Sequence, residues 1–234
     1  ININDPQNIS QGNPALRPEY TNSFEFNYNQ NYDNGSFLGV LYFRNNDDDI
    51  TSFSDTITTA QYEQLSNASI DANAILNTYI NAQFTNRMGA EITVNHRIGN
   101  LEFIPNLNLQ YRKVKAVFGD LNLSNQGFNW EGKLIVNYKL TSKSPVFNDM
   151  NFQLTGNYES KEVIPQGRNK EQFDSDFAIR KQFLKKNAAS LTFAINDVFN
   201  TNRWGLIYDT EDFYQDSYRR WNVRSFRLTF TYLF

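Results

Sequence analysis

The sequence predicts an all-β fold, specifically an antiparallel transmembrane β-barrel, and three observations lead to it. Apolar and polar residues alternate along most of the chain, and a period of two is the pattern of strands with two unlike faces. The alternating segments are mostly longer than the roughly 5–6 residues of a strand in a globular sheet. The connections alternate between short and long, as the turns and loops of outer-membrane barrels do.

The composition excludes several other classes of protein. No run approaches the roughly 18–20 apolar residues of a spanning helix, which excludes a helical membrane protein. The 20 Phe and 13 Tyr suit a barrel, because barrels place aromatic residues in two interfacial girdles. With no Cys and one His, the chain offers no disulfide and little for His-based metal binding or catalysis. The net charge of -3 gives no reason to expect nucleic acid.

The alternation divides the chain into nine expected strands. In order they cover residues 20–30, 36–53, 78–97, 101–118, 128–140, 150–161, 173–183, 188–195 and 225–234. Asn34-Gly35 after the first strand supplies the positive φ angles of a two-residue hairpin turn, and Gly99-Asn100 turns the chain after the third. The segment 54–77 is the longest expected loop, in which 60–65 could form a short helix. Further loops are expected at 165–170 and 209–216.

The apolar faces of the strands are rich in aromatic residues. The first strand sets Phe24, Phe26 and Tyr28 against polar neighbours, whereas the second is apolar on both faces at its start, so its facing stays open. The fifth to eighth strands repeat the alternation. The apolar face of the ninth consists of Phe226, Leu228, Phe230, Tyr232 and Phe234. A strand that ends a chain on Phe resembles the last strand of many bacterial outer-membrane barrels.

Alternation alone would also fit a soluble sugar-binding β-sandwich, which would fold without detergent. The barrel is favoured because the polar faces carry many Asn, Gln, Thr and paired charges, as a water-filled lumen would. Counting back from a periplasmic C-terminus also places the short turns on the periplasmic side. A sandwich therefore remains the alternative fold.

The odd number of strands suggests that further strands exist. Bacterial single-chain barrels have even strand counts, and a bilayer tolerates no open sheet edge. We therefore expect residues 20–234 to be the C-terminal part of a larger barrel, and 1–19 to be an extracellular loop segment. No signal peptide is visible, so an exported chain would be mature or incomplete.

Several short segments resemble one family, the TonB-dependent outer-membrane receptors, in the branch that includes SusC-like transporters. The segments are 13–20 (NPALRPEY), 49–51 (DIT), 89–91 (GAE), 165–168 (PQGR), 179–181 (IRK), 196–200 (NDVFN) and 231–234 (TYLF). Each segment is short, but together and in this order they are spread over nearly the whole chain. The resemblance implies a barrel of about 22 strands around an N-terminal plug. The nine strands would be its last portion.

The resemblance also implies a function and partners. It implies nutrient uptake across the outer membrane of a Gram-negative cell, driven through TonB. The expected partners are outer-membrane lipid, the rest of the barrel and its plug, TonB and a surface lipoprotein of the SusD-like kind. Two alternatives stay open: a receptor-like barrel that is a non-transporting subunit of a larger assembly, and a passive porin. The sequence does not identify the substrate.

Aromatic and basic residues gather near the last loop, and we expect substrate contacts there. The candidates are Trp204, Tyr208, Tyr214, Arg219 and Arg220. Aromatic rings could stack on a flat ligand and arginines could bind an anionic one. The competing interpretation is an aromatic girdle with charges paired inside the loop, which is the more common use of such residues.

Neither a metal site nor a catalytic site is expected. The acidic run Asp47-Asp48-Asp49 with Asp55 could bind Ca²⁺, but its spacing is not that of an EF-hand and a solvated run is more common. His96 lies beside a turn without a second His. No nucleophile, base and orienting acid recur with the spacing of an active site. We therefore expect neither a cofactor nor an enzyme.

Overall fold

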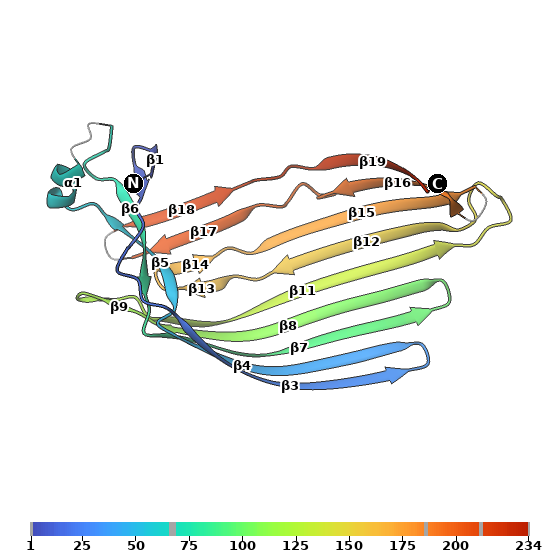
Figure 1. The fold of residues 1–234 in the computed structure, drawn as a ribbon, viewed down its shortest axis with the longest axis horizontal. Coiled ribbons are helices and arrows are strands. Elements are labelled where there is room, and N and C mark those ends of the chain that lie inside the picture. The colour runs from blue at the N-terminus through green and yellow to red at the C-terminus, as the bar shows by residue number, and fades with distance from the viewer. Residues whose placement is uncertain (1, 66–68, 185–186, 211–212, 234) are drawn as a thin grey trace.

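The computed structural model describes residues 2–65, 69–184, 187–210 and 213–233. Its centre is an antiparallel sheet of nine strands that pair in chain order (Figure 1). The strands are β3 (Tyr20–Tyr32), β4 (Gly35–Asp47), β7 (Phe84–Ile98), β8 (Leu101–Lys115), β11 (Asn125–Leu140), β12 (Met150–Glu159), β15 (Gln172–Phe183), β16 (Ala189–Asn196) and β19 (Ser225–Tyr232). This confirms the all-β prediction, and each of the nine overlaps one expected strand. Phe234, at the end of the ninth expected strand, lies outside the described residues.

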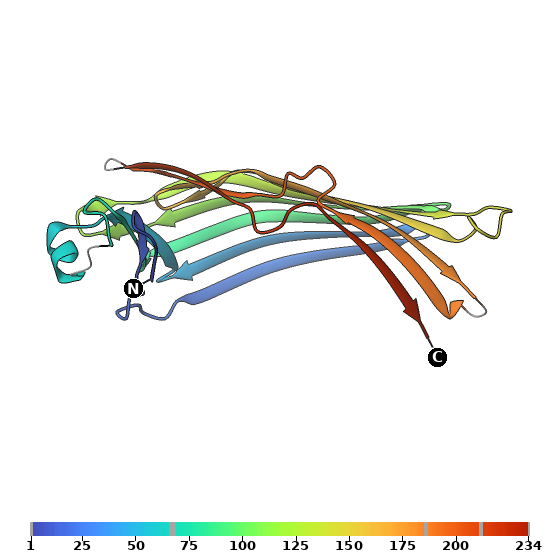
Figure 2. The ribbon, with the colours of Figure 1, turned by 90° about the horizontal axis from the view of Figure 1, so that it is seen from above.

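The two ends of this main sheet differ. The connections after β3, β7, β11 and β15 lie at one end together with the C-terminus, and we call it the turn end (Figure 1). The longer connections carry further elements at the opposite end, which we call the loop end. In the described chain β3 and β19 each pair on one side only, so the sheet is curled but open (Figure 2).

The loop end contains more strands than the alternation predicted. One sheet consists of β1 (Asn2–Asp5), β2 (Asn8–Ser10), β6 (Ile75–Asn81) and β5 (Ile50–Thr56), with helix α1 (Thr59–Leu65) beside it. A hairpin is formed by β9 (Val117–Phe118) and β10 (Leu121–Asn122). A second sheet consists of β13 (Glu162–Ile164), β14 (Gly167–Asn169), β17 (Trp204–Asp209) and β18 (Tyr214–Arg219).

Three segments that the sequence predicts as loops are therefore partly strand. Residues 1–19, 165–170 and 209–216 were expected as loops but contain parts of these small sheets. Strands of three or four residues, such as β1, β2 and β14, are too short to show a period. The second expected strand is also two strands, because Asp48 adopts a positive φ of 55° and the chain bends between β4 and β5. The third expected strand likewise covers the end of β6 as well as β7. The helix expected at 60–65 is confirmed as α1.

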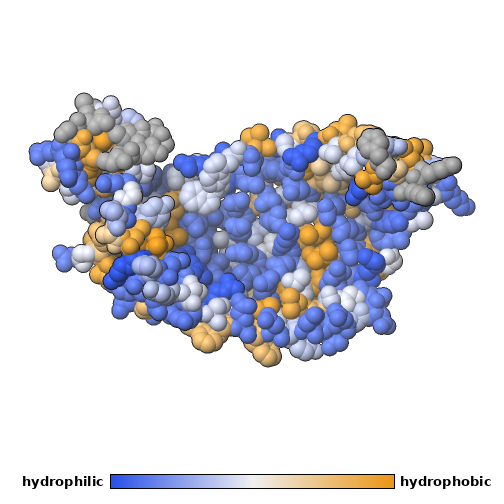
Figure 3. Space-filling model, in the orientation of Figure 1, coloured by the Kyte–Doolittle hydropathy of each residue, from blue (hydrophilic) through white to orange (hydrophobic). Residues whose placement is uncertain are grey.

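The main sheet has one apolar and one polar face. Register partners share a face, so Phe26, Leu41, Ala90, Leu109 and Trp130 form one continuous apolar row from β3 to β11. Many apolar side chains of this face are exposed, among them Leu154, Phe226 and Leu228. The opposite, concave face is mostly hydrophilic (Figure 3). Within the described residues no helix is long and apolar enough to cross a membrane.

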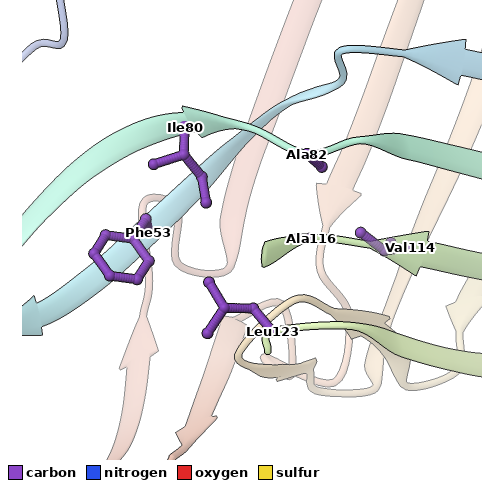
Figure 4. Packing of buried hydrophobic residues seen from close by; sticks show 6 residues of the cluster. All are labelled: Phe53, Ile80, Ala82, Val114, Ala116 and Leu123. Atoms are coloured by element: carbon purple, nitrogen blue, oxygen red, sulfur yellow. The ribbon is translucent and has the colours of Figure 1, made fainter. Parts of the chain in front are cut away.

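The buried apolar core lies at the loop end and not within the main sheet. One cluster joins β5 and β6 to the ends of β8 and the β9–β10 hairpin (Figure 4), and its members are Phe53, Ile80, Ala82, Val114, Ala116 and Leu123. The rings of Phe53 and Phe118 lie 4.8 Å apart. A second cluster consists of Ile9, Ile57, Ile70 and Ala74, and Tyr62 and Leu65 of α1 pack against it, which holds the helix beside β2. Burial of these side chains fixes the loop-end elements on the main sheet.

Asp197 organises the connection from β16 to β17. It has a positive φ of 52°, is only 5% exposed, and accepts hydrogen bonds from the backbone N–H groups of Thr201 (2.8 Å) and Asn202 (3.0 Å). Its own N–H donates to the Asp176 carboxylate (2.9 Å). The segment 196–200, one of those that carry the family resemblance, is thus a structural corner.

Replacing Asp197 with alanine should destabilise this corner by about 1–3 kcal/mol, because two part-buried N–H groups would lose their charged acceptor. Hydrogen exchange of the 197–202 amides measures the effect. Asp197→Asn keeps a side-chain oxygen and tolerates positive φ, so it should lose less. Equal protection in the alanine variant and the wild type would contradict this role.

Candidate ligand-binding pocket at the loop end

A pocket of about 620 Å³ opens among the loop-end elements. Four segments that are distant in sequence form its walls: the end of β5, the β9–β10 hairpin, the β13–β14 turn and the tip of β17–β18. Its lining residues are Asp55, Asp120, Leu121, Asn122, Leu123, Pro165, Gln166, Asp209, Thr210 and Phe213. Three carboxylates, amides and a hydroxyl beside apolar side chains can bind a small ligand through hydrogen bonds to its donors and through apolar contact.

Gln166 fixes one wall of the pocket. Its side-chain oxygen accepts a hydrogen bond from Ser54 N (2.7 Å), and its Nε2 donates to Ser54 O (2.6 Å), although 112 residues separate the two. The amide is 6% exposed and bonds the β5 backbone as a neighbouring strand would. On the other side Asn125 donates to the carbonyl oxygens of Ile164 (2.9 Å) and Gly167 (3.1 Å). The segment 165–168 therefore fastens β5 to the second loop-end sheet.

Gln166→Ala should weaken this junction by about 1–3 kcal/mol, since the Ser54 N–H and C=O would lose buried partners. Limited proteolysis near β5 in the full-length protein reports the loss. Gln126→Ala is the matched control, because that side chain is exposed and makes no hydrogen bond among those described. Equal proteolysis rates in the two variants would refute the role.

The segment before β3 is fastened to the first loop-end sheet. Asn13 donates to Tyr79 O (2.9 Å), Asn81 accepts from Arg17 N (2.8 Å), and Glu19 accepts from Ile50 N (3.1 Å). The Arg17 guanidinium pairs with Asp48 (2.5 Å). The polar residues of segment 13–20 thus have structural partners in β5, β6 and the bend before β5.

The five site residues expected from sequence do not form one surface. Trp204 and Arg219 are register partners, and both lie near Trp221. The rings of Trp204 and Trp221 are 6.1 Å apart, and the Arg219 guanidinium carbon lies 5.7 Å from the Trp221 ring. Tyr208 is 6% exposed and packs on Phe213, whereas Tyr214 is 65% exposed and projects from the opposite face of the hairpin. Arg220 donates to Asn200 O (3.0 Å). None of the five lines the pocket.

Two cations, Lys170 and Arg203, lie over the ring of Tyr218, which is on the same face of the β17–β18 hairpin as Tyr214. Lys170 Nζ lies 3.6 Å and Arg203 Cζ 4.4 Å from the ring centroid. Lys170 also pairs with Asp216. Desolvation lowers the pKa of Lys170, but its hydrogen bonds to Asp216 and Tyr218 outweigh this and raise the pKa above its ordinary value. The contacts of Lys170 with Asp216 and Tyr218 hold the hairpin on the segment after β14.

The acidic run considered for Ca²⁺ is divided among separate partners. Asp48 pairs with Arg17, and Asp49 accepts a hydrogen bond from Thr85 while Asp55 lies at the pocket. Across the described ranges no group of three or more acidic or histidine side chains is arranged to hold a metal ion. His96 hydrogen-bonds to the Tyr32 hydroxyl (3.2 Å).

Comparison with known proteins identifies the type of fold. Residues 1–232 match the model of the outer membrane protein beta-barrel family. The solved structure of the FrpB iron transporter from Neisseria meningitidis (F3-3 variant) is similar, with a TM-score of 0.54 and 17% identity over 96% of this chain. The chain spans 33% of the length of that transporter. No curated protein matches the chain. The structural likeness concerns the fold.

Proposed function

We propose, because the chain belongs to the outer membrane protein beta-barrel family, that its main sheet is part of the wall of an outer-membrane transport barrel. In this proposal the apolar face contacts lipid and the polar face lines the lumen. The turn end with the C-terminus faces the periplasm, and the loop end faces the outside. The unpaired outer edges of β3 and β19, and the coverage of only 33% of a similar transporter, support further strands that close the barrel.

The observation that carries the proposal is the separation of the two faces over nine long strands. On β11 the outward-facing Trp130 and Tyr138 are eight residues apart, which is roughly 27 Å along a strand. With a strand tilt of about 35–45°, this gives a height of about 19–22 Å, somewhat less than the ~25 Å of a barrel's apolar band. Trp130 contacts Tyr158 (4.6 Å between rings) and Tyr138 contacts Phe152 (6.3 Å), so aromatic pairs lie at both borders.

The loop-end pocket supports uptake of a small ligand. Its volume of about 620 Å³ lies within the roughly 300–1,000 Å³ of typical small-molecule sites. In the proposed cycle the ligand binds at the outer loops, passes the polar lumen, and enters when a plug supplied by the rest of the protein moves. TonB would supply the energy from the periplasmic side, and a surface lipoprotein of the SusD-like kind would deliver ligand from outside.

Planar-bilayer conductance of the full-length protein tests this function. A plugged transporter should show no steady conductance until mild urea displaces the plug, after which open channels should appear. Steady conductance without urea would identify a passive porin instead. Deletion of the gene should reduce uptake of the true nutrient, and loss of TonB should reduce it equally. Absence of any channel, with unchanged uptake in a panel of nutrients, would support a non-transporting subunit.

A further inference from the structure

Three arginines lie side by side on the polar face near the loop end. Arg44 of β4 is the register partner of Arg87 of β7, and Arg87 is the register partner of Arg112 of β8. We call Arg44, Arg87 and Arg112 the arginine row. Side chains of direct cross-strand partners start about 4.5–5.5 Å apart, and like charges in these positions repel. Such a row is stable only where anionic groups compensate its charge.

The two outer arginines have their own partners. Arg44 pairs with Glu25 (2.7 Å) and lies over the Tyr42 ring (5.1 Å). Arg112 pairs with Glu162 (3.2 Å) and donates to Val163 O (3.0 Å), so β13 covers it. Asp49, which also acts electrostatically on Arg112, accepts hydrogen bonds from Thr85 and Asn46 (3.4 Å).

The middle of the row is left without a counter-ion. In the part of the chain that the structure describes, Arg87 forms neither an ion pair nor a side-chain hydrogen bond, although it is partly exposed on the polar face. Beside it, Arg112 is 7% exposed and its Nε has no hydrogen-bond partner. A buried guanidinium N–H without an acceptor is costly, so this combination indicates a missing acceptor.

The surroundings restrict where that acceptor can bind. On the turn-end side Tyr42 lies close to Gly89, and its hydroxyl donates to Asn108 (2.9 Å). Beyond Arg112, Val163 of β13 lies over Gly127. Arg44 is exposed and Arg87 is partly exposed, so these two are accessible from the concave face, which the proposed function makes the lumen, whereas Arg112 lies beneath β13.

We propose that the arginine row is a lumenal binding site for the anionic group, carboxylate or phosphate, of a small ligand. A planar guanidinium donates two parallel hydrogen bonds to either group, and the flanking arginines add positive potential. The inference rests on the proposed transport function, because that function places the polar face in the lumen. It names the chemical class of the transported ligand, which would carry an acidic group for the arginine row in addition to the donor groups that the three carboxylates of the loop-end pocket would bind.

Isothermal titration calorimetry of the full-length protein in detergent tests the site by measuring the dissociation constants of two probes, inorganic pyrophosphate and malonate. Wild type should bind at least one of them, more weakly at high salt. Arg87→Gln should weaken binding at least about tenfold, and Arg87→Lys should weaken it less because the charge stays while the paired donors are lost. A preference for pyrophosphate or malonate assigns the ligand's group as phosphate or carboxylate.

Arg180→Gln is the matched control. Arg180 also lies on the polar face without an ion pair among the described residues, but near the turn end, beside a second pocket of about 540 Å³. This variant removes the same charge as Arg87→Gln, but at the other end of the main sheet. Its affinity for the probe should therefore stay within about twofold of wild type. No binding by wild type, equal binding by Arg87→Gln, or an equal loss in the control would each overturn the site. Bilayer conductance judges the transport proposal separately, because it does not depend on Arg87.

Discussion

Leu154→Arg should destabilise the folded protein in a bilayer by about 2–4 kcal/mol, the cost of an arginine on the lipid face near the midplane of a barrel. Leu154 lies in the middle of β12, is 47% exposed, and has the apolar register partners Val136 and Phe177. Neither of these partners could pair with the guanidinium. The full-length protein refolded into liposomes, with urea-dependent unfolding as the readout, measures the loss.

The neighbouring position provides the control for that experiment. Thr155 points to the polar face, where its register partner Asp176 could pair with a new arginine. Thr155→Arg should therefore change stability by no more than about 0.5 kcal/mol. Similar losses in the two variants would mean that both faces are equivalent, and the assignment of lipid and lumen faces would fail.

Gly167→Ala should separate β14 from β17 and disorder the loop-end pocket. A Cβ at this position would lie 1.9 Å from Ile207 O and 3.1 Å from the Tyr208 Cα, and backbone atoms cannot move aside as a flexible side chain can. We expect a loss of about 1–3 kcal/mol in the stability of this junction. Faster hydrogen exchange in β17 and β18, with unchanged exchange in β11 and β12, is the expected pattern.

Gly12→Ala is the matched substitution, because no atom lies within 4 Å of a Cβ placed there. It should leave exchange in the loop end unchanged. If Gly167→Ala also left β17 unchanged, the close approach of the two backbones would not describe the protein in solution.

The main sheet could be predicted from the sequence because its determinants are local. Each long strand carries a two-residue period over ten or so positions, and turns such as Asn34-Gly35 separate consecutive strands. Since these strands pair in chain order, no distant pairing had to be inferred. The short turns and the C-terminus consequently appear at one end, as expected.

The pocket could not be predicted because its determinants are distant in sequence. The bonds between Gln166 and Ser54 join positions 112 residues apart, and neither residue belongs to a periodic segment. Trp204, Tyr208, Tyr214, Arg219 and Arg220 are close in sequence but do not form one surface, because a hairpin sends neighbouring side chains to opposite faces. Their contact with substrate stays a prediction. The segment 165–168 belongs to the family resemblance, but the three residues of β14 are too few to show the period of a strand.

The pairing of the main strands in chain order has a consequence for how such proteins diversify. Each strand contacts its predecessor and successor in the chain, so one hairpin, such as β11 with β12, is a complete unit of the wall. Gene duplication or loss of one such unit changes the circumference and leaves every other pairing in register. Lineages could therefore widen or narrow the pore two strands at a time, while the loops of each unit evolve separately.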